Sequence, residues 1–504
     1  MNDLTNGRGA GWHCRSWLTA GLAGLMLAGC AVGPEYQRPA PPATADYATQ
    51  PLPSTVSATN VAGGGAQHLI LGADLAGDWW TLFHSAPLNA LIQAALTNNP
   101  DLKAAQAALQ VARENVLAQR GGYYPSVAAG FSASRAKQSE LISPTPYASI
   151  FQYNLFTPEV TVSYVPDVFG QNRRTMESIQ AEAQAVRFQM MAAYTTLTAN
   201  VVVTAIQEGA VHMQMAATRE LVAISSNMVE IVKYQMAKGY ASRLDLAAQE
   251  SQQAQMMATL PPLVKQAGQL RDQLAVLAGR FPNEAPTNGF ELDSLHLPTE
   301  LPVSLPSALV AQRPDVRQAE ANLHAATAQI GIAVANRLPN ITLTANAGST
   351  ALAIDQVFTS GTGFWGIGAA ATAPLFQGGT LLHQERAARA ACVEAAEQYR
   401  STVLTAFQTV ADTLVALQQD AEAVQAAAAA AQDARITREL TQRQWRDGYI
   451  GRLALLAAEQ AGWQTRISLV QAQANRYADT AALFQALGGG WWQRAELTKD
   501  NHEK

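Results

Sequence analysis

Apolar residues recur at alternating spacings of three and four residues in two segments of the chain. One segment has them at Val316, Ala319, Leu323, Ala326, Ile330 and Ala333, and the other at Leu102, Ala105, Leu109, Ala112 and Val116. A repeat of 3.5 residues is typical of a supercoiled helix pair that packs along a narrow seam. The pattern therefore predicts a helix in each segment, and the alanines in the seam favour close approach of its partner.

Strict alternation follows each of these helices, after an intervening proline. Residues 341–346 alternate Ile, Leu and Ala with Thr and Asn, and residues 160–164 alternate Val and Tyr with Thr and Ser. A period of two is typical of β-strands. Loops rich in Ser, Gly and Pro, near residues 139–155 and 353–363, join the strands in pairs. We therefore expect one β-hairpin in each half of the chain and four strands in all.

A long stretch without proline follows each hairpin, at residues 171–237 and 380–447. A helix of 67 residues would be about 100 Å long. The alternative is a series of shorter helices joined by polar turns, and Gly209 is one place where such a break could occur. Either way, each stretch is expected to turn at a Gly-Tyr pair and to return as a second helix that ends near Gly279 or Gly488.

Four short motifs occur twice in the same order along the chain. The pairs are Asn99-Pro100-Asp101-Leu102 with Arg313-Pro314-Asp315-Val316, Tyr124-Pro125-Ser126-Val127 with Leu338-Pro339-Asn340-Ile341, Val168-Phe169-Gly170 with Leu375-Phe376-Gln377, and Gly239-Tyr240 with Gly448-Tyr449. Ordered matches at a nearly constant offset indicate an internal duplication of about 200 residues.

The amino-terminal residues have the composition of a secretory signal. Arg8 and Arg15 precede an apolar run at residues 17–27, and this run is shorter than the roughly 20 residues that span a membrane. It ends in Leu27-Ala28-Gly29-Cys30, which resembles a bacterial lipobox. We expect cleavage before Cys30 and acylation of its thiol, with an ordinary signal peptide as the alternative. Several acyl chains would anchor the protein stably, because each buried CH₂ contributes about 0.8 kcal/mol.

These patterns predict six segments along the chain. They are a signal peptide (1–29), an acylated tether rich in Pro, Ala, Thr and Gly (30–77), a first repeat (78–287), a linker (288–305), a second repeat (306–490) and a polar carboxy-terminal tail (491–504).

Composition narrows the function classes. Charged residues make up 14% of the chain, against about 25% in an average soluble protein. Alanine and glutamine are abundant, as in long helices that pack on small side chains. The net charge of −5 supplies no basic surface, so we expect no nucleic-acid partner.

No motif for catalysis or for metal binding occurs. The segment Gly361–Gly366 fits GxGxxG by letter, but it precedes a predicted strand instead of opening a helix after one. The chain has no Walker loop, HExxH, GxSxG or CxxC, and its eight histidines are scattered. We expect neither an enzyme nor a bound metal or cofactor, apart from the covalent lipid on Cys30.

The strand count bears on oligomeric state. Four strands cannot close a barrel, and an open sheet edge is not tolerated in hydrocarbon. Two chains would supply eight strands, whose side chains nearly fill the interior, whereas three chains would supply twelve and leave a channel. If the hairpins enter a membrane, which alternation alone indicates only weakly, we expect a homotrimer.

Several motifs resemble one family of membrane proteins. They are Cys30-Ala31-Val32-Gly33-Pro34-Glu35-Tyr36 with Arg38-Pro39, Asp78-Trp79-Trp80, Arg313-Pro314-Asp315-Val316 and Leu487-Gly488-Gly489-Gly490-Trp491. Over residues 27–492 the chain resembles the NodT-type outer-membrane efflux lipoproteins, which are related to the OprM- and TolC-like channels.

The resemblance implies an α+β membrane protein with an internal duplication. Three protomers would build a twelve-stranded transmembrane β-barrel, four strands from each, continued by a coiled-coil α-helical barrel of twelve helices across the periplasm. It also implies a lipid-anchored location in the outer membrane of a Gram-negative bacterium. The partners would be a periplasmic adaptor and an inner-membrane RND-type transporter, and the role would be passive export of drugs or other toxic small molecules.

The resemblance also locates a candidate gate where the long helices turn, at Lys238–Asp245 and Asp447–Leu456. Family members narrow this end with rings of aspartate, leucine and arginine. The corresponding candidates are Arg243, Asp245, Arg452, Leu453 and Leu456.

Threefold symmetry would give the gate a polar and an apolar part. Three copies of Asp245 would lie close together, or each would pair with an arginine of a neighbouring helix, and an exposed pair contributes about 0–1 kcal/mol. The second turn carries Ala457 and Gln460 where related channels often carry charge, so its part of the gate is expected to be mainly apolar. The alternative is that these residues are solvated and contact an adaptor.

Two other functions stay open. One is a related duct that serves protein secretion. The other is a periplasmic coiled-coil scaffold lipoprotein, which would not need the two proline-bounded hairpins. The duct is shared by whatever its transporter delivers, so we expect substrate specificity to lie upstream of it.

Overall fold

The computed structural model describes residues 31–44, 46–47, 53–58, 61–137, 152–285 and 289–498 of the 504-residue chain. The chain divides into two compact units. The first comprises Met1–Arg38, Gln110–Ala185 and Glu320–Gln398, and the second comprises Pro39–Leu109, Val186–Ala319 and Tyr399–Lys504. Each unit therefore draws on both predicted repeats, and the six predicted segment boundaries stay a prediction. Cys30 and the signal segment lie outside the described residues, so the acylation also stays a prediction.

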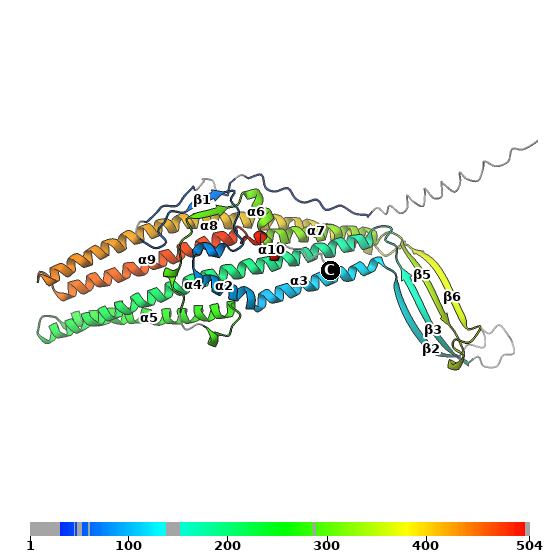
Figure 1. Ribbon diagram of the computed structural model, residues 1–504, viewed down its shortest axis with the longest axis horizontal. Coiled ribbons are helices and arrows are strands. Elements are labelled where there is room, and N and C mark those ends of the chain that lie inside the picture. The colour runs from blue at the N-terminus through cyan, green and yellow to red at the C-terminus, as the bar shows by residue number, and fades with distance from the viewer. Residues whose placement is uncertain are drawn as a thin grey trace, which may run out of the picture. The chain divides into compact units, whose positions relative to one another are not determined.

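One four-stranded antiparallel sheet belongs to the first unit (Figure 1). Its strands lie in the order β2 (Ser126–Lys137), β3 (Gln152–Tyr164), β5 (Asn340–Ser349) and β6 (Gly363–Thr372). The inner pair, β3 and β5, joins the hairpin of one repeat to that of the other, for example at Val160 and Ala347. This confirms one hairpin in each repeat, and the chance GxGxxG match lies at the start of β6.

The sheet has apolar side chains on its surface and two unpaired edges. All but one residue of β2 is exposed, and the exposed apolar side chains include Val127, Phe131, Trp365 and Ile367. Within the described residues, neither β2 nor β6 has a strand on its outer side. One protomer therefore presents an open, largely uncovered sheet.

A second sheet contradicts the expectation of only four strands. Strands β1 (His68–Leu71) and β4 (Glu300–Val303) pair in parallel, which makes six strands in the described residues. Each has only four residues, which is too short for alternation to be recognised. They lie in the predicted tether and linker, so the pair fastens these two segments together.

Four helices repeat in length from one half of the chain to the other. Helices α4 (Gln171–Ala237) and α8 (Thr380–Arg446) each have 67 residues. Helices α5 (Arg243–Leu277) and α9 (Arg452–Ala486) each have 35. Equal lengths confirm the internal duplication, and the alternative of several shorter helices is wrong.

Gly209 does not interrupt α4. A Cβ atom at this position would lie 2.8 Å from the backbone nitrogen of Leu292, so glycine allows a loop to approach the helix. The buried Glu208 beside it accepts a hydrogen bond of 3.1 Å from the backbone N–H of Phe290. The glycine therefore serves packing between segments, not a bend.

Shorter helices precede each hairpin. They are α2 (Ala86–Asn98) and α3 (Pro100–Arg120) in the first half, and α6 (Pro306–Gln312) and α7 (Pro314–Ala335) in the second. A proline at the start of α3 and of α7 ends the preceding helix, because proline disfavours the helical conformation of the residue before it.

The residue before each of these prolines makes the same contact in both halves. The Asn99 side-chain amide donates a 3.1 Å hydrogen bond to the carbonyl of Leu277 at the end of α5. The Arg313 guanidinium donates a 3.0 Å hydrogen bond to the carbonyl of Ala486 at the end of α9. Carbonyls in the last turn of a helix lack partners within it, so a duplicated side-chain donor fixes both helix ends.

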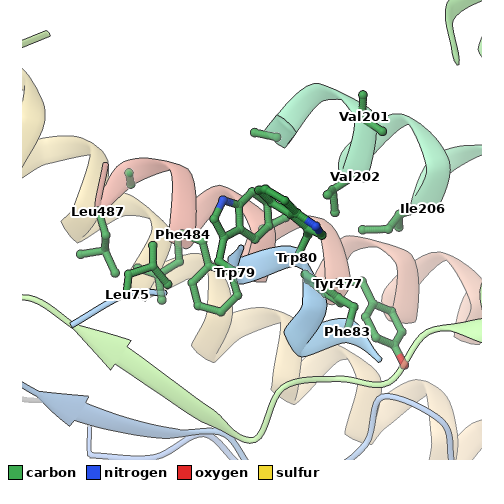
Figure 2. Close-up of a cluster of buried hydrophobic side chains, with 14 of the residues drawn as sticks. Leu75, Trp79, Trp80, Phe83, Val201, Val202, Ile206, Tyr477, Phe484 and Leu487 are labelled. Atoms are coloured by element: carbon green, nitrogen blue, oxygen red, sulfur yellow. The ribbon is translucent and has the colours of Figure 1, made fainter. Parts of the chain in front are cut away.

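Aromatic side chains form the centre of the second unit (Figure 2). Trp79 and Phe83 come from a short 3₁₀ helix (Trp79–Phe83), and Tyr477 and Phe484 come from α9. All four are at most 2% exposed, and the Trp79 and Phe484 ring centroids lie 5.4 Å apart. This cluster ties the start of the first repeat to the end of the second.

The packed region extends into the predicted polar tail. Trp491 is buried beside Phe188, and its indole N–H donates a 2.7 Å hydrogen bond to the carbonyl of Gln312. A short helix, α10 (Ala495–Thr498), follows it. The first residue after position 490, Trp491, is therefore part of the core.

The predicted tether is extended but is bound to the helices in both units. In the first, Tyr36 stacks on His324 of α7 at 4.1 Å between ring centroids. Arg38 forms a 2.9 Å ion pair with Glu320, and Arg174 of α4 donates to the carbonyl of Val32.

In the second unit, the fully buried Arg476 of α9 holds the segment before β1. Its guanidinium donates to the carbonyls of Gly63 and Gly65 and to the hydroxyl of Thr55, at 2.8–2.9 Å. The carboxyl group of Asp420 on α8 lies near this arginine and near Asp479 of α9. Burial raises the pKa of Asp420 to about 7, and the hydrogen bond with Asp479 and its charge add to the increase.

None of the helices among the described residues is long and apolar enough to span a membrane.

Candidate gate at the two helical turns

The first turn, between α4 and α5, reverses the chain at a glycine. Gly239 has φ = 79°, a value that glycine adopts without strain. The backbone N–H of Tyr240 donates a 2.8 Å hydrogen bond to the carbonyl of Gln235. This is the bond pattern that ends many helices, and it leaves the Tyr240 side chain 84% exposed.

Asp245 acts within this turn as part of a capping box. Its carboxylate accepts hydrogen bonds from the backbone N–H and the hydroxyl of Ser242, at 2.8 and 2.7 Å. The backbone N–H of Asp245 donates in return to the Ser242 hydroxyl. The hydrogen bond from the backbone of Ser242, followed by that from its hydroxyl, lowers the pKa of Asp245. The first turn of α5 is therefore stabilised by a carboxylate that stays ionised.

The second turn, between α8 and α9, has the same backbone and a different cap. Gly448 has φ = 80°, and the N–H of Tyr449 donates to the carbonyl of Gln444. Gly451 takes the place of the capping serine, so no side-chain cap is possible. Arg452 instead lies over the ring of Trp445, with 4.9 Å from the guanidinium carbon to the ring centroid. A cation over an aromatic face closes this turn.

The start of α9 packs against α4. Leu456 is 1% exposed and contacts Ile224 and Met228 of α4, with Leu453 partly buried beside them. The equivalent of Leu453 in the first repeat is Leu244, which is 78% exposed. The two turns therefore differ. Apolar contacts hold the start of α9 against α4, whereas Leu244 at the start of α5 is exposed.

The five candidate residues fall into two groups. Arg243, Asp245 and Arg452 are exposed, and within the described residues no ion pair joins Asp245 to an arginine of the same protomer. Leu453 and Leu456 share the apolar contact with α4. In a single protomer Leu456 contributes to packing and not to an exposed lining. A role for the five residues in gating stays a prediction.

Three exposed residues at these turns were not among the candidates. Tyr240 and Tyr449 are 84% and 81% exposed, and Leu244 is 78% exposed. Tyr240 and Tyr449 belong to the repeated Gly-Tyr motif, but repetition of a motif does not show that a side chain is exposed. Large apolar side chains left in solvent at a chain reversal suit contact with another protein.

No group of three or more His, Cys, Asp or Glu side chains in the described part of the chain could hold a metal ion.

Comparison with known proteins agrees with this architecture. A family model described as outer membrane efflux protein matches residues 91–280 and 305–489. The probable efflux pump outer membrane protein TtgC of Pseudomonas putida is 28% identical over 95% of this chain and 96% of its own length. The pyoverdine export outer membrane protein OpmQ of the same species is 30% identical over 82% of this chain and 88% of its own.

A solved structure has the same fold. The Campylobacter jejuni CmeC outer membrane channel aligns with a TM-score of 0.81 at 21% identity, covering 94% of this chain and 96% of the channel.

Proposed function

The chain belongs to the outer membrane efflux protein family, and from this premise we propose that it is the outer-membrane channel of a tripartite efflux pump. It conducts small molecules passively from a transporter and adaptor to the outside and performs no chemistry on them. The observation that carries the proposal is the duplicated arrangement of a hairpin followed by a 67-residue helix. The two copies of this arrangement supply both a sheet and a long helical wall.

The sheet edges support a homotrimer. Strands β2 and β6 each have a row of backbone groups that need partners, and hydrocarbon offers none. Pairing β2 of one copy with β6 of the next closes the sheet, and three copies give twelve strands around an open lumen. The exposed Val127, Phe131, Trp365 and Ile367 suit a surface that faces lipid on one side.

The helical turns support partners at the other end of each long helix. The exposed Tyr240, Leu244 and Tyr449 are contacts for a periplasmic adaptor, which joins the channel to an inner-membrane RND-type transporter. Acylation of Cys30 adds an anchor in outer-membrane lipid. The names of the relatives include pyoverdine export and toluene efflux as well as cation efflux. We propose small organic molecules as the substrate class, as in the first two.

The gate is proposed to combine the two groups of residues at the turns. Leu453 and Leu456 hold α9 against α4 in the closed state. Arg243, Asp245 and Arg452 face the lumen or the neighbouring protomer, where threefold symmetry brings their copies together.

Single-channel conductance in a planar bilayer tests the proposal, together with the native mass of the detergent-purified protein. A trimer with small, flickering conductance is the expected result. A monomer without conductance would refute the channel and leave a coiled-coil scaffold as the better interpretation.

A further inference from the structure

The second unit contains a cavity of about 1280 Å³ that the duct function does not use. It lies between α4, α8 and α9, and Ser57, Ala58 and Val61 of the tether line part of it. Cavities that bind small molecules usually measure about 300–1,000 Å³. This cavity is therefore large enough for a whole ligand.

A difference between the two repeats creates part of this space. In the first repeat, Gln253 of α5 donates a 2.9 Å hydrogen bond to the hydroxyl of Ser226 on α4. The equivalent positions in the second repeat are Gly462 of α9 and Arg435 of α8. A Cβ atom on Gly462 would meet no atom within 4 Å. The contact that fills the first helix pair is therefore missing from the second.

The wall formed by α8 has also lost side-chain volume. Ala428, Ala429 and Ala431 line the cavity, and their equivalents in α4 are Arg219, Glu220 and Val222. Met213, Trp463 and Leu469 supply larger apolar side chains around this floor of alanines. The result is a run of small apolar side chains on α8, flanked by Gln425 and Gln432 and accompanied by the indole of Trp463.

The charges around the cavity favour an anion. Its charged lining residues are Arg435, Arg438, Arg466 and Glu459, which give an excess of two positive charges. Arg435 forms a 3.3 Å ion pair with Glu439. Arg438 and Arg466 make no hydrogen bond or ion pair with any other described residue. Two unpaired guanidinium groups next to an apolar floor are suited to a carboxylate or sulfonate with an apolar body.

We propose that this cavity binds an organic anion of small-molecule size. The anionic group binds at Arg438 and Arg466, and the apolar part lies on the alanine floor beside Trp463. The site lies within one protomer and is separate from the turns, so it gives the wall of the duct a binding function of its own.

The test measures binding of a dansylated undecanoic acid to the detergent-purified full-length protein by fluorescence anisotropy. The methyl ester of the same probe serves as the uncharged ligand. The double variant Arg438→Gln/Arg466→Gln removes the charges from exposed positions. It should weaken binding of the acid about tenfold or more and leave the ester unaffected, because a hydrogen bond to a charged group is lost.

A second pair of variants separates the cavity from the rest of the surface. Gly462→Phe places a ring in the cavity, whereas Gly268→Phe places one on α5, where a Cβ atom also meets nothing within 4 Å. Gly462→Phe should weaken binding of acid and ester alike, and Gly268→Phe should bind both as the wild type does. Equal binding by these two variants, or equal binding of acid and ester by the wild type, would overturn the proposal. Conductance is not needed for either readout, so failure here leaves the channel function standing.

Discussion

Leu456 offers the most direct perturbation of the candidate gate. Its side chain is 1% exposed between α9 and α4, against Ile224 and Met228. Removing a leucine of this kind from water is worth about 1.5–3 kcal/mol, and Leu→Ala changes in cores range over about 2–5 kcal/mol once the cavity is included. The contact lies near the end of two helices, where neighbours can partly fill the space. We therefore expect about 2 kcal/mol from Leu456→Ala.

That loss predicts a measurable change in gating. If the contact holds α9 against α4 only in the closed state, about 2 kcal/mol shifts the ratio of open to closed channels roughly 30-fold toward open. The assay is single-channel open probability in a planar bilayer. Leu244→Ala is the matched control, because this leucine occupies the other turn and is 78% exposed, and it should leave open probability unchanged.

Two results would refute this reasoning. Leu456→Ala could destabilise the protein in thermal unfolding and still have the open probability of the wild type, in which case the contact supports folding without gating. Alternatively, Leu244→Ala and Leu456→Ala could raise open probability equally, which would show that burial against α4 is not the cause.

Four further outcomes are expected. The folded state raises the pKa of Asp420 to about 7 and therefore binds the proton more tightly than the unfolded chain does, so stability falls as pH rises from about 4 to about 7. Asp420→Asn should remove this fall, which thermal unfolding at several pH values between about 4 and about 7 would show. Arg476→Met leaves the carbonyls of Gly63 and Gly65 without their donor, at about 1–3 kcal/mol for each group that stays buried, and limited proteolysis should then cut this segment faster. Ser242→Ala removes the cap of α5 and should weaken its first turn by about 1 kcal/mol, seen as faster hydrogen exchange there. Cys30→Ser should abolish acylation, which intact mass would show as loss of the lipid.

The sequence predicts those parts of the fold that depend on short-range pattern. The 67-residue helices follow from the absence of proline, and the hairpins follow from alternation between prolines. The Gly-Tyr turns follow from the special conformation of Gly239 and Gly448. In each case neighbouring residues carry the signal.

Contacts between distant segments could not be predicted in the same way. Strands β1 and β4 pair across more than 200 residues, and Leu456 meets α4 across a similar separation. Composition identifies residues 30–77 as extended, but it cannot show that Arg476 binds them, because one buried arginine carries no periodic signal. The cavity was also missed, since it depends on what Gly462 fails to contact.

The equal helix lengths imply where this chain can accept insertions. Helices α3 and α4 begin 71 residues apart, whereas α7 and α8 begin 66 apart, so the two copies differ by five residues within the hairpin region. The helices differ by none over 67 and 35 residues. One residue added to a helix rotates everything beyond it by about 100° and moves it 1.5 Å along the axis, which would misalign every later contact. An epitope tag therefore belongs in the loop of a β-hairpin. A single residue inserted into α4 or α8 should disrupt the protein more than a longer insertion in a hairpin loop.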